Sequence, residues 1–178
     1  MKRLYTRKAV LLCSIAVLAA VYVLQLALEN RTNVRTVFTE ESIDSVVISR
    51  DGEPVVSVQM QDGKWTAGNQ HLPAKENRVN GIVNAVSEIK ILETVHLGGT
   101  DAGRYGLNEE SSLKAEAFSG GKKVRTLSVG KSTATGSQCY VQIDDDKKIY
   151  LAQGSLRSSL EVSEEDLIEE EKPEAEQE

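Results

Sequence analysis

Residues 45–66, SVVISRDGEPVVSVQMQDGKWT, form a pattern of three short strands joined by two tight turns. Apolar and polar residues alternate on both sides of Asp51-Gly52, and the same dipeptide recurs at Asp62-Gly63, just before the single tryptophan, Trp65. A two-residue Asp-Gly turn has the backbone twist that β-hairpins prefer. The segment therefore predicts a β-hairpin followed by a third strand that carries the tryptophan.

A long amphipathic helix is expected directly after these strands. Pro73 is tolerated in a first helical turn, because its missing N–H would be unpaired there anyway. Gly81 lies inside the expected helix at a cost of roughly 1 kcal/mol relative to alanine, which indicates either a close backbone approach or an imperfect helix. The helix should extend to about Leu92 and lie across a sheet. Its apolar stripe consists of residues spaced three and four apart: Val79, Ile82, Val83, Val86 and Ile89.

Two further hairpins are predicted towards the C-terminus. Residues 113–117 alternate up to Gly120-Gly121 and residues 124–129 return, and later residues 140–143 turn through 144–147 into 149–151. Tight turns between short strands, together with one long helix, predict an α+β domain with a mostly antiparallel sheet.

The N-terminal region contains an uncharged apolar run, AVLLCSIAVLAAVYVLQLAL, at residues 9–28. At about 1.5 Å per residue a helix of this length crosses the roughly 30 Å hydrocarbon core of a bilayer. The basic flank at residues 1–8 predicts a cytoplasmic N-terminus, with everything from about Glu29 outside the cytoplasm. We therefore expect a single-pass protein of a bacterial inner membrane. A cleaved signal peptide is the alternative, although its apolar region is usually only about 7 to 15 residues long.

Composition divides the remaining chain into a stalk at residues 29–42, a domain at 43–168 and an acidic tail at 169–178. The net charge of −6 belongs to the C-terminal end, because ten acidic residues lie between Glu161 and Glu178 against the single Lys172. This tail cannot bury apolar surface and is expected to be disordered. The domain shows no basic patch with interleaved aromatic residues, so nucleic acid is not an expected partner.

Six short motifs follow one another along the domain: Asp62-Gly63-Lys64-Trp65, Leu72-Pro73-Ala74, Tyr105-Gly106-Leu107, Val129-Gly130, Cys139-Tyr140-Val141 and Ile149-Tyr150-Leu151. Their order and spacing resemble the DUF4340 family, a domain of uncharacterised function. The similarity extends from about Ile43 to Leu167. The sequence departs from the family pattern at Lys75, where relatives commonly have an acidic residue, and at Glu110 or Ser111, where they commonly have proline. The resemblance implies structural roles for the motif residues, which are Trp65, Pro73, Tyr105, Gly106, Leu107, Gly130, Tyr140 and Tyr150.

Members of that family are typically bacterial and membrane-anchored, and some occur beside ABC-2-type transporters and gliding-motility auxiliary proteins. The resemblance therefore implies an accessory role at such a membrane complex. It supplies no catalytic residues, and we expect no cofactor and no metal.

Three sequence patterns resemble binding sites, but each is better explained as an ordinary structural feature. Gly130-Lys131-Ser132 ends like a phosphate-binding loop, but Arg125 stands where that loop requires glycine. His71 and His96 have no cysteine or second histidine at ligand spacing. The three carboxylates of residues 144–146 are consecutive, which favours a solvated hairpin tip over a calcium loop.

These observations favour a non-enzymatic, membrane-anchored interaction domain outside the cytoplasm. A domain that binds a small ligand or an envelope polymer is the alternative, and it would require a concave pocket. A hydrolase is the third interpretation, and it would require serine, histidine and aspartate to converge in a cleft.

Overall fold

The computed structural model describes residues 13–23, 34–98, 101–144 and 146–169. The chain divides into two compact units, Met1–Asn33 and Val34–Glu178. Residues 13–23 of the first unit are helical, and no helix in the described ranges is both long and apolar enough to cross a membrane. The basic flank, both ends of the predicted span at 9–28 and residues 170–178 of the predicted tail lie outside the described residues.

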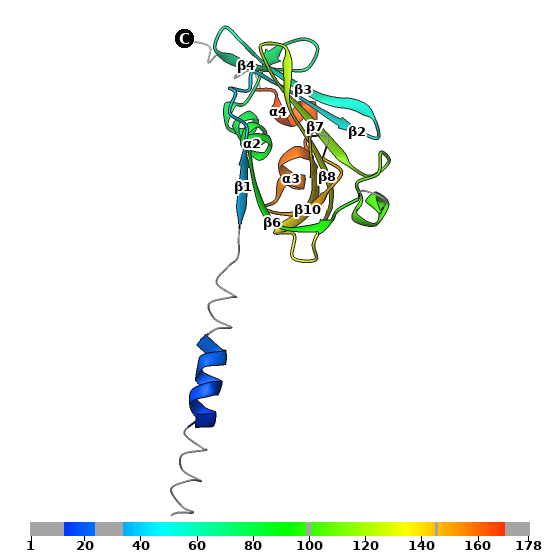
Figure 1. The fold of residues 1–178 in the computed structure, drawn as a ribbon. Coiled ribbons are helices and arrows are strands. Elements are labelled where there is room, and N and C mark those ends of the chain that lie inside the picture. The colour runs from blue at the N-terminus through cyan, green and yellow to red at the C-terminus, as the bar shows by residue number, and fades with distance from the viewer. Residues whose placement is uncertain (1–12, 24–33, 99–100, 145, 170–178) are drawn as a thin grey trace, which may run out of the picture. The chain divides into compact units, whose positions relative to one another are not determined.

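The second unit is built on a single antiparallel sheet, as the hairpin patterns predict (Figure 1). The strand order is β1-β6-β10-β9-β8-β7-β2-β3-β4-β5, and each neighbouring pair is antiparallel. The ten strands of this described part are β1 (Arg35–Phe38), β2 (Ser45–Arg50), β3 (Glu53–Gln61), β4 (Lys64–Ala67), β5 (Leu72–Pro73), β6 (Glu88–His96), β7 (Leu113–Ser119), β8 (Lys122–Ser132), β9 (Gln138–Ile143) and β10 (Ile149–Gln153).

The predicted β2–β3 hairpin and the third strand are confirmed. Asp51 and Gly52 have φ values of 54° and 79°, and Asp62 and Gly63 have φ values of 50° and 79°. Two consecutive residues with positive φ are what a type I′ hairpin turn requires. Trp65 lies on β4 and is only 7% exposed, so the sole tryptophan contributes to the core.

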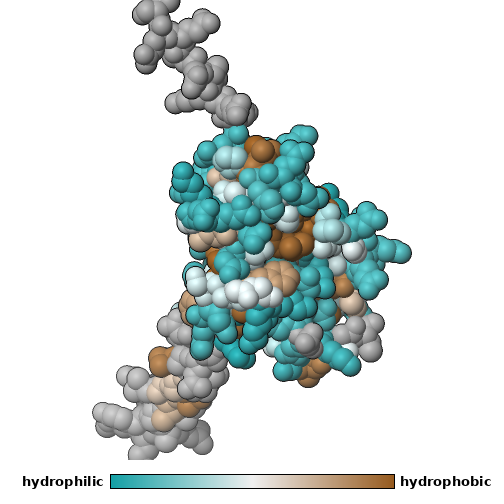
Figure 2. Space-filling model, turned by 90° about the horizontal axis from the view of Figure 1, so that it is seen from above, coloured by the Kyte–Doolittle hydropathy of each residue, from teal (hydrophilic) through white to brown (hydrophobic). Residues whose placement is uncertain are grey.

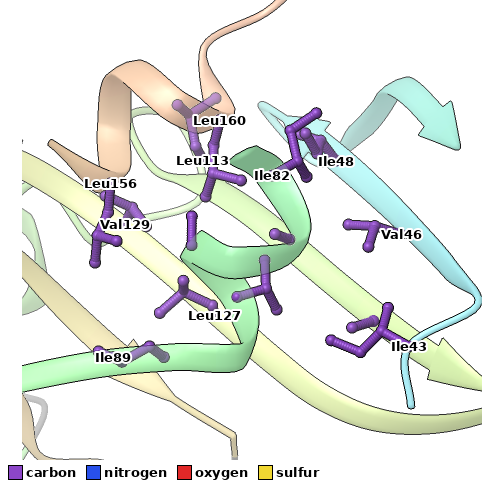
Figure 3. Close-up of a cluster of buried hydrophobic side chains, with 14 of the residues drawn as sticks. Ile43, Val46, Ile48, Ile82, Ile89, Leu113, Leu127, Val129, Leu156 and Leu160 are labelled. Atoms are coloured by element: carbon purple, nitrogen blue, oxygen red, sulfur yellow. The ribbon is translucent and has the colours of Figure 1, made fainter. Parts of the chain in front are cut away.

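Three short helices and one 3-10 turn accompany the sheet: α2 (Glu76–Ser87), α3 (Leu156–Leu160), α4 (Glu164–Leu167) and η1 (Ala102–Tyr105). Figure 1 shows α2, α3 and α4 gathered on one side of the curved sheet. In Figure 3, Ile82 of α2 and Leu156 and Leu160 of α3 lie over apolar side chains of the strands. The core consists of aliphatic residues from both layers, including Val46, Ile48, Val79, Ile82, Leu113, Leu127, Val129, Val141 and Leu160.

The predicted extent of the long helix is wrong. α2 has 12 residues and ends at Ser87, and Pro73 lies on β5 rather than in a first helical turn. Ile89 and Ile91 belong to β6, where both are buried while Glu88 and Lys90 between them are exposed. This alternation suits a strand that pairs with β1 on one side and β10 on the other. A Cβ at Gly81 would have no atom within 4 Å, so this glycine is a helix imperfection and not a close approach.

The end of the predicted stalk belongs to the sheet. Arg35–Phe38 forms the edge strand β1 and pairs with β6, and the N–H of Thr39 donates to the carbonyl of Ser87 at 3.0 Å. Arg125 of β8 fixes the same segment, because its Nη2 donates to the Phe38 carbonyl at 2.8 Å. The folded unit therefore begins at about Val34, nine residues before the boundary predicted at residue 43.

Candidate functional site

A cleft of about 690 Å³ lies between the β3–β4 turn and the start of α2. Its volume falls within the roughly 300–1,000 Å³ range of small-molecule sites. Trp65, Pro73 and Ala74 supply its apolar lining, and charged residues from the turn, from α2 and from the C-terminal segment surround them. Figure 2 shows that hydrophilic side chains dominate the visible surface and that hydrophobic patches are separate from one another.

Backbone pairing brings the lining of this cleft together. The N–H of Ala74 donates to the Trp65 carbonyl at 2.9 Å, which holds the residues after β5 against β4. The C-terminal segment then adds to the other edge of β5: the N–H of Lys75 donates to the Leu167 carbonyl at 2.7 Å, and the N–H of Glu169 donates to the Pro73 carbonyl at 2.9 Å. This pairing places Glu169 in the lining, about a hundred positions along the chain from Trp65.

Trp65, which lines the cleft, carries an indole N–H that can donate one hydrogen bond. It has no hydrogen-bond acceptor among the described residues. No buried side-chain nitrogen or oxygen in this part of the chain lacks a partner, so the N–H must lie within the 7% of the residue that solvent reaches. Tryptophan N–H groups usually find a partner when the ring is buried. Because solvent reaches this N–H, it can donate to water or to a bound ligand.

Charges of both signs surround this donor. Lys64 and Lys75 carry ammonium groups, and Asp62, Glu76 and Glu169 carry carboxylates. The Lys75 ammonium donates to the Asp166 carbonyl at 3.4 Å, whereas the Lys64 ammonium and the three carboxylates have no partner among the described residues. Lys75 also occupies the N-cap of α2 and makes no side-chain cap. The first N–H groups of a helix have no intrahelical acceptor, and here the N–H of Arg78 donates to Asn77 Oδ1 at 2.8 Å.

The Tyr105-Gly106-Leu107 motif packs against two other motif residues. The rings of Tyr105 and Tyr140 meet edge to face, with centroids 4.9 Å apart at an angle of 60°. Gly130 of β8 lies directly under the turn, because a Cβ there would be 2.2 Å from the Tyr105 carbonyl oxygen. Gly106 has a φ of 69° and closes η1 in the left-handed conformation. Five motif residues therefore form one structural cluster away from the cleft.

Tyr150 occupies a third location. Its hydroxyl donates to Asp146 Oδ2 at 2.6 Å. Burial, followed by this hydrogen bond to a carboxylate, raises the pKa of Tyr150 to about 12. The same hydrogen bond is the main cause that lowers the pKa of Asp146. A cavity of about 200 Å³ lies beside this pair, with Arg35 and Asp144 in its lining.

Comparison with known proteins identifies the family. Residues 65–173 match the family model described as "Domain of unknown function (DUF4340)", which covers more than half of the 178 residues. The chain belongs to the DUF4340 family. No curated protein and no solved structure matches the chain.

The matched region of this DUF4340 chain begins at Trp65 and includes all eight motif residues. The β2–β3 hairpin lies before it, although the resemblance suggested a start at about Ile43. The eight motif residues lie at three places in the fold, and each group has a structural role. Trp65 and Pro73 line the cleft, the second group fixes the η1 turn on the sheet, and Tyr150 anchors the loop before β10.

Arg125 is a structural residue of this chain that the sequence patterns do not predict. It is 5% exposed, and its guanidinium donates to Thr39 Oγ1, to the Phe38 carbonyl and to Asp144 Oδ2 at 2.8–3.1 Å. From the sequence alone, Arg125 is only the residue that interrupts a phosphate-binding loop pattern. An arginine between apolar alternating positions of a strand was the one available signal.

The other chemical candidates have structural partners. Lys131 lies on β8, and its ammonium donates to the Arg104 carbonyl at 3.3 Å. His71 Nδ1 lies 3.3 Å from the Gln61 amide nitrogen. Asp144 accepts from the Thr126 N–H and from Arg125. Within the described ranges, no three His, Cys, Asp or Glu residues are placed to hold a metal ion.

Proposed function

We propose that this DUF4340 protein is a non-enzymatic, membrane-anchored interaction domain that lies outside the cytoplasm and assists a membrane complex, such as an ABC-2-type transporter. The uncharged run at residues 9–28 and the basic flank before it support the anchor and its orientation. The transporter association rests on the family resemblance.

The residues that line the Trp65 cleft favour a binding function over a catalytic one. Its lining offers a solvent-accessible indole N–H and unpaired charges, which are groups that recognise a partner. The one hydroxyl among these lining residues belongs to Thr66, and it donates to the Gln59 carbonyl at 3.0 Å. Nucleophilic catalysis requires a hydroxyl or thiol beside a base. The cleft does not bring these two groups together.

Affinity purification of the full chain from detergent-solubilised membranes tests the accessory role. We expect a permease or an ATPase to be recovered in stoichiometric amount with the wild-type protein. The variant Trp65→Phe should recover less of it, while Lys122→Gln, at an exposed position on β8 away from the cleft, should recover as much as the wild type. Recovery of the chain alone, under conditions that keep other membrane complexes intact, would contradict the proposal.

A second candidate function is the binding of a small ligand, and the volume of the cleft favours it. A site of about 690 Å³ is large enough for a short oligomer or a metabolite. Mass spectrometry of the purified chain under non-denaturing conditions tests this function. We expect an added mass that disappears on unfolding, and an unmodified chain mass across several preparations would count against it.

A further inference from the structure

We propose that the Trp65 cleft binds a zwitterion of the amino-acid type, most suitably a short peptide with a free carboxylate and a free ammonium group. This inference specifies the ligand of the second candidate function and rests on it. It does not depend on the anchor or on a transporter.

The solvent-accessible indole N–H can donate to a ligand, and the surrounding cations favour an acceptor that is negatively charged. Lys64 and Lys75 line the same cleft, and the uncapped first turn of α2 adds the positive end of a helix dipole. A ligand carboxylate can accept from the Trp65 N–H and be attracted by both ammonium groups. Hydrogen bonds to a charged acceptor are roughly twice as strong as neutral ones.

The carboxylates that line the cleft favour a positively charged group on the same ligand. Asp62, Glu76 and Glu169 come from a hairpin turn, a helix and the C-terminal segment, and none of them has a partner among the described residues. A simple anion would be repelled by three carboxylates, and a simple cation would be repelled by two ammonium groups. A molecule with one charge of each sign can pair with both the carboxylates and the ammonium groups of the cleft.

The burial of Trp65 argues against a neutral sugar as the ligand. Sugars stack on exposed aromatic faces, but Trp65 is only 7% exposed and packs within the core. The accessible part of the residue includes a hydrogen-bond donor, which suits a carboxylate oxygen. The volume of the cleft accommodates a ligand larger than a single amino acid.

The fluorescence of the full chain in detergent reports on this cleft directly, because Trp65 is the only tryptophan. Titration with L-alanyl-L-alanine should change the emission in a saturable way, and calorimetry should give the same affinity. N-acetylation or C-terminal amidation of the dipeptide should each weaken binding about two- to fivefold, the range expected for an exposed ion pair. L-alanine serves as the probe for a single amino acid, and maltose as the probe for a neutral sugar.

Amino-acid substitutions test which charged residues of the cleft contribute to dipeptide binding. Lys64→Gln and Glu169→Gln should each weaken dipeptide binding by a similar factor. The matched controls Lys122→Gln and Glu53→Gln, at exposed positions outside the cleft, should bind as the wild type does. Trp65→Phe, followed by calorimetry, should weaken binding because it removes the N–H.

The outcomes separate this inference from the function on which it rests. Equal binding of capped and uncapped dipeptides, or a response to maltose alone, would overturn the zwitterion and leave ligand binding in place. Absence of any response to all the probes, by both fluorescence and calorimetry, would overturn the zwitterion and would count against the ligand-binding function as well.

Discussion

At the scale of single residues, Gly130 shows how a missing side chain positions a loop. A Cβ at this position would lie 2.2 Å from the Tyr105 carbonyl oxygen and 3.0 Å from that of Gly106. Both neighbours are backbone atoms, so they cannot move without displacing the whole turn. The residue therefore determines how closely the Tyr105-Gly106-Leu107 motif approaches β8.

Gly130→Ala should reduce the free energy of unfolding by about 1–3 kcal/mol, the usual cost of overpacking. Gly81→Ala is its matched control, because a Cβ there meets nothing within 4 Å and alanine favours a helix interior by up to about 1 kcal/mol. Urea denaturation of both variants provides the measurement. Equal stability changes would mean that the turn is not held against Gly130.

Tyr150 provides a residue whose ionisation is linked to folding. Its folded pKa of about 12 lies above the ordinary value of 10.0, because burial and Asp146 disfavour the tyrosinate. A raised folded pKa contributes stability that is fully present below pH 10 and is lost as the pH rises towards 12. The difference in tyrosinate absorbance between wild type and Tyr150→Phe should therefore have its midpoint at about pH 12. A midpoint near pH 10 would show that neither burial nor the Asp146 hydrogen bond raises the pKa of Tyr150 in solution.

At the scale of secondary-structure elements, the hairpins are predictable from the sequence because a tight turn and its two strands are neighbours along the chain. The two Asp-Gly turns specify their own backbone geometry, and the flanking alternation gives the register. The boundary between α2 and β6 was not predictable in this way. Ile82, Val86 and Ile89 fit a helical stripe, but Ile89 and Ile91 also fit a strand, and only pairing with β1 and β10 decides between them.

The same reasoning explains what was missed at the candidate site. The motif order identified Trp65 and Pro73, which are close in sequence, and Pro73 pairs across β4 and β5 with Thr66, the residue after Trp65. The approach of Glu169 depends on the C-terminal segment folding back onto β5, and no local pattern encodes that contact. By contrast, the capping box of α4 joins Ser163 and Asp166, which are only three residues apart, so a contact of this kind is within reach of a local sequence pattern.

β1 is an element held by few contacts, and Arg125 supplies several of them. The strand has four residues and pairs on one side with β6, while Arg125 donates to Phe38 and Thr39. Arg125→Met should reduce the free energy of unfolding by about 1–3 kcal/mol, because it removes the part-buried hydrogen bonds that Arg125 donates to Thr39, Phe38 and Asp144.

Amide hydrogen exchange localises this effect, since residues 35–39 should exchange faster in the variant than the strands at the centre of the sheet. Arg50→Met is the matched control. Arg50 is exposed, its single ion pair with Glu161 is 3.5 Å long, and such pairs contribute at most about 1 kcal/mol. Comparable losses in the two variants would show that Arg125 does not fix the edge strand.

At the scale of the whole molecule, the second unit solves the problem of building a core with few aromatic rings. Aromatic residues make up only 4% of the sequence, so apolar burial must come mainly from aliphatic side chains. A continuous sheet with α2 and α3 on one face aligns alternate valines, isoleucines, leucines and alanines from many strands in one layer (Figure 3). Two of the eight motif residues, Trp65 and Tyr150, contribute aromatic rings to this mainly aliphatic core.

The orientation of the chain across the membrane is the prediction on which the accessory role depends most. If residues 9–28 span the bilayer with the basic flank inside, Lys122→Cys should react with a membrane-impermeant maleimide on intact spheroplasts, because Lys122 is exposed at the start of β8. Lys2→Cys should react only after lysis. Cys139 gives little background, since it is 1% exposed and burial raises the pKa of its thiol. Labelling of Lys2→Cys on intact spheroplasts, with Lys122→Cys protected until lysis, would reverse the topology and remove the proposed extracytoplasmic role.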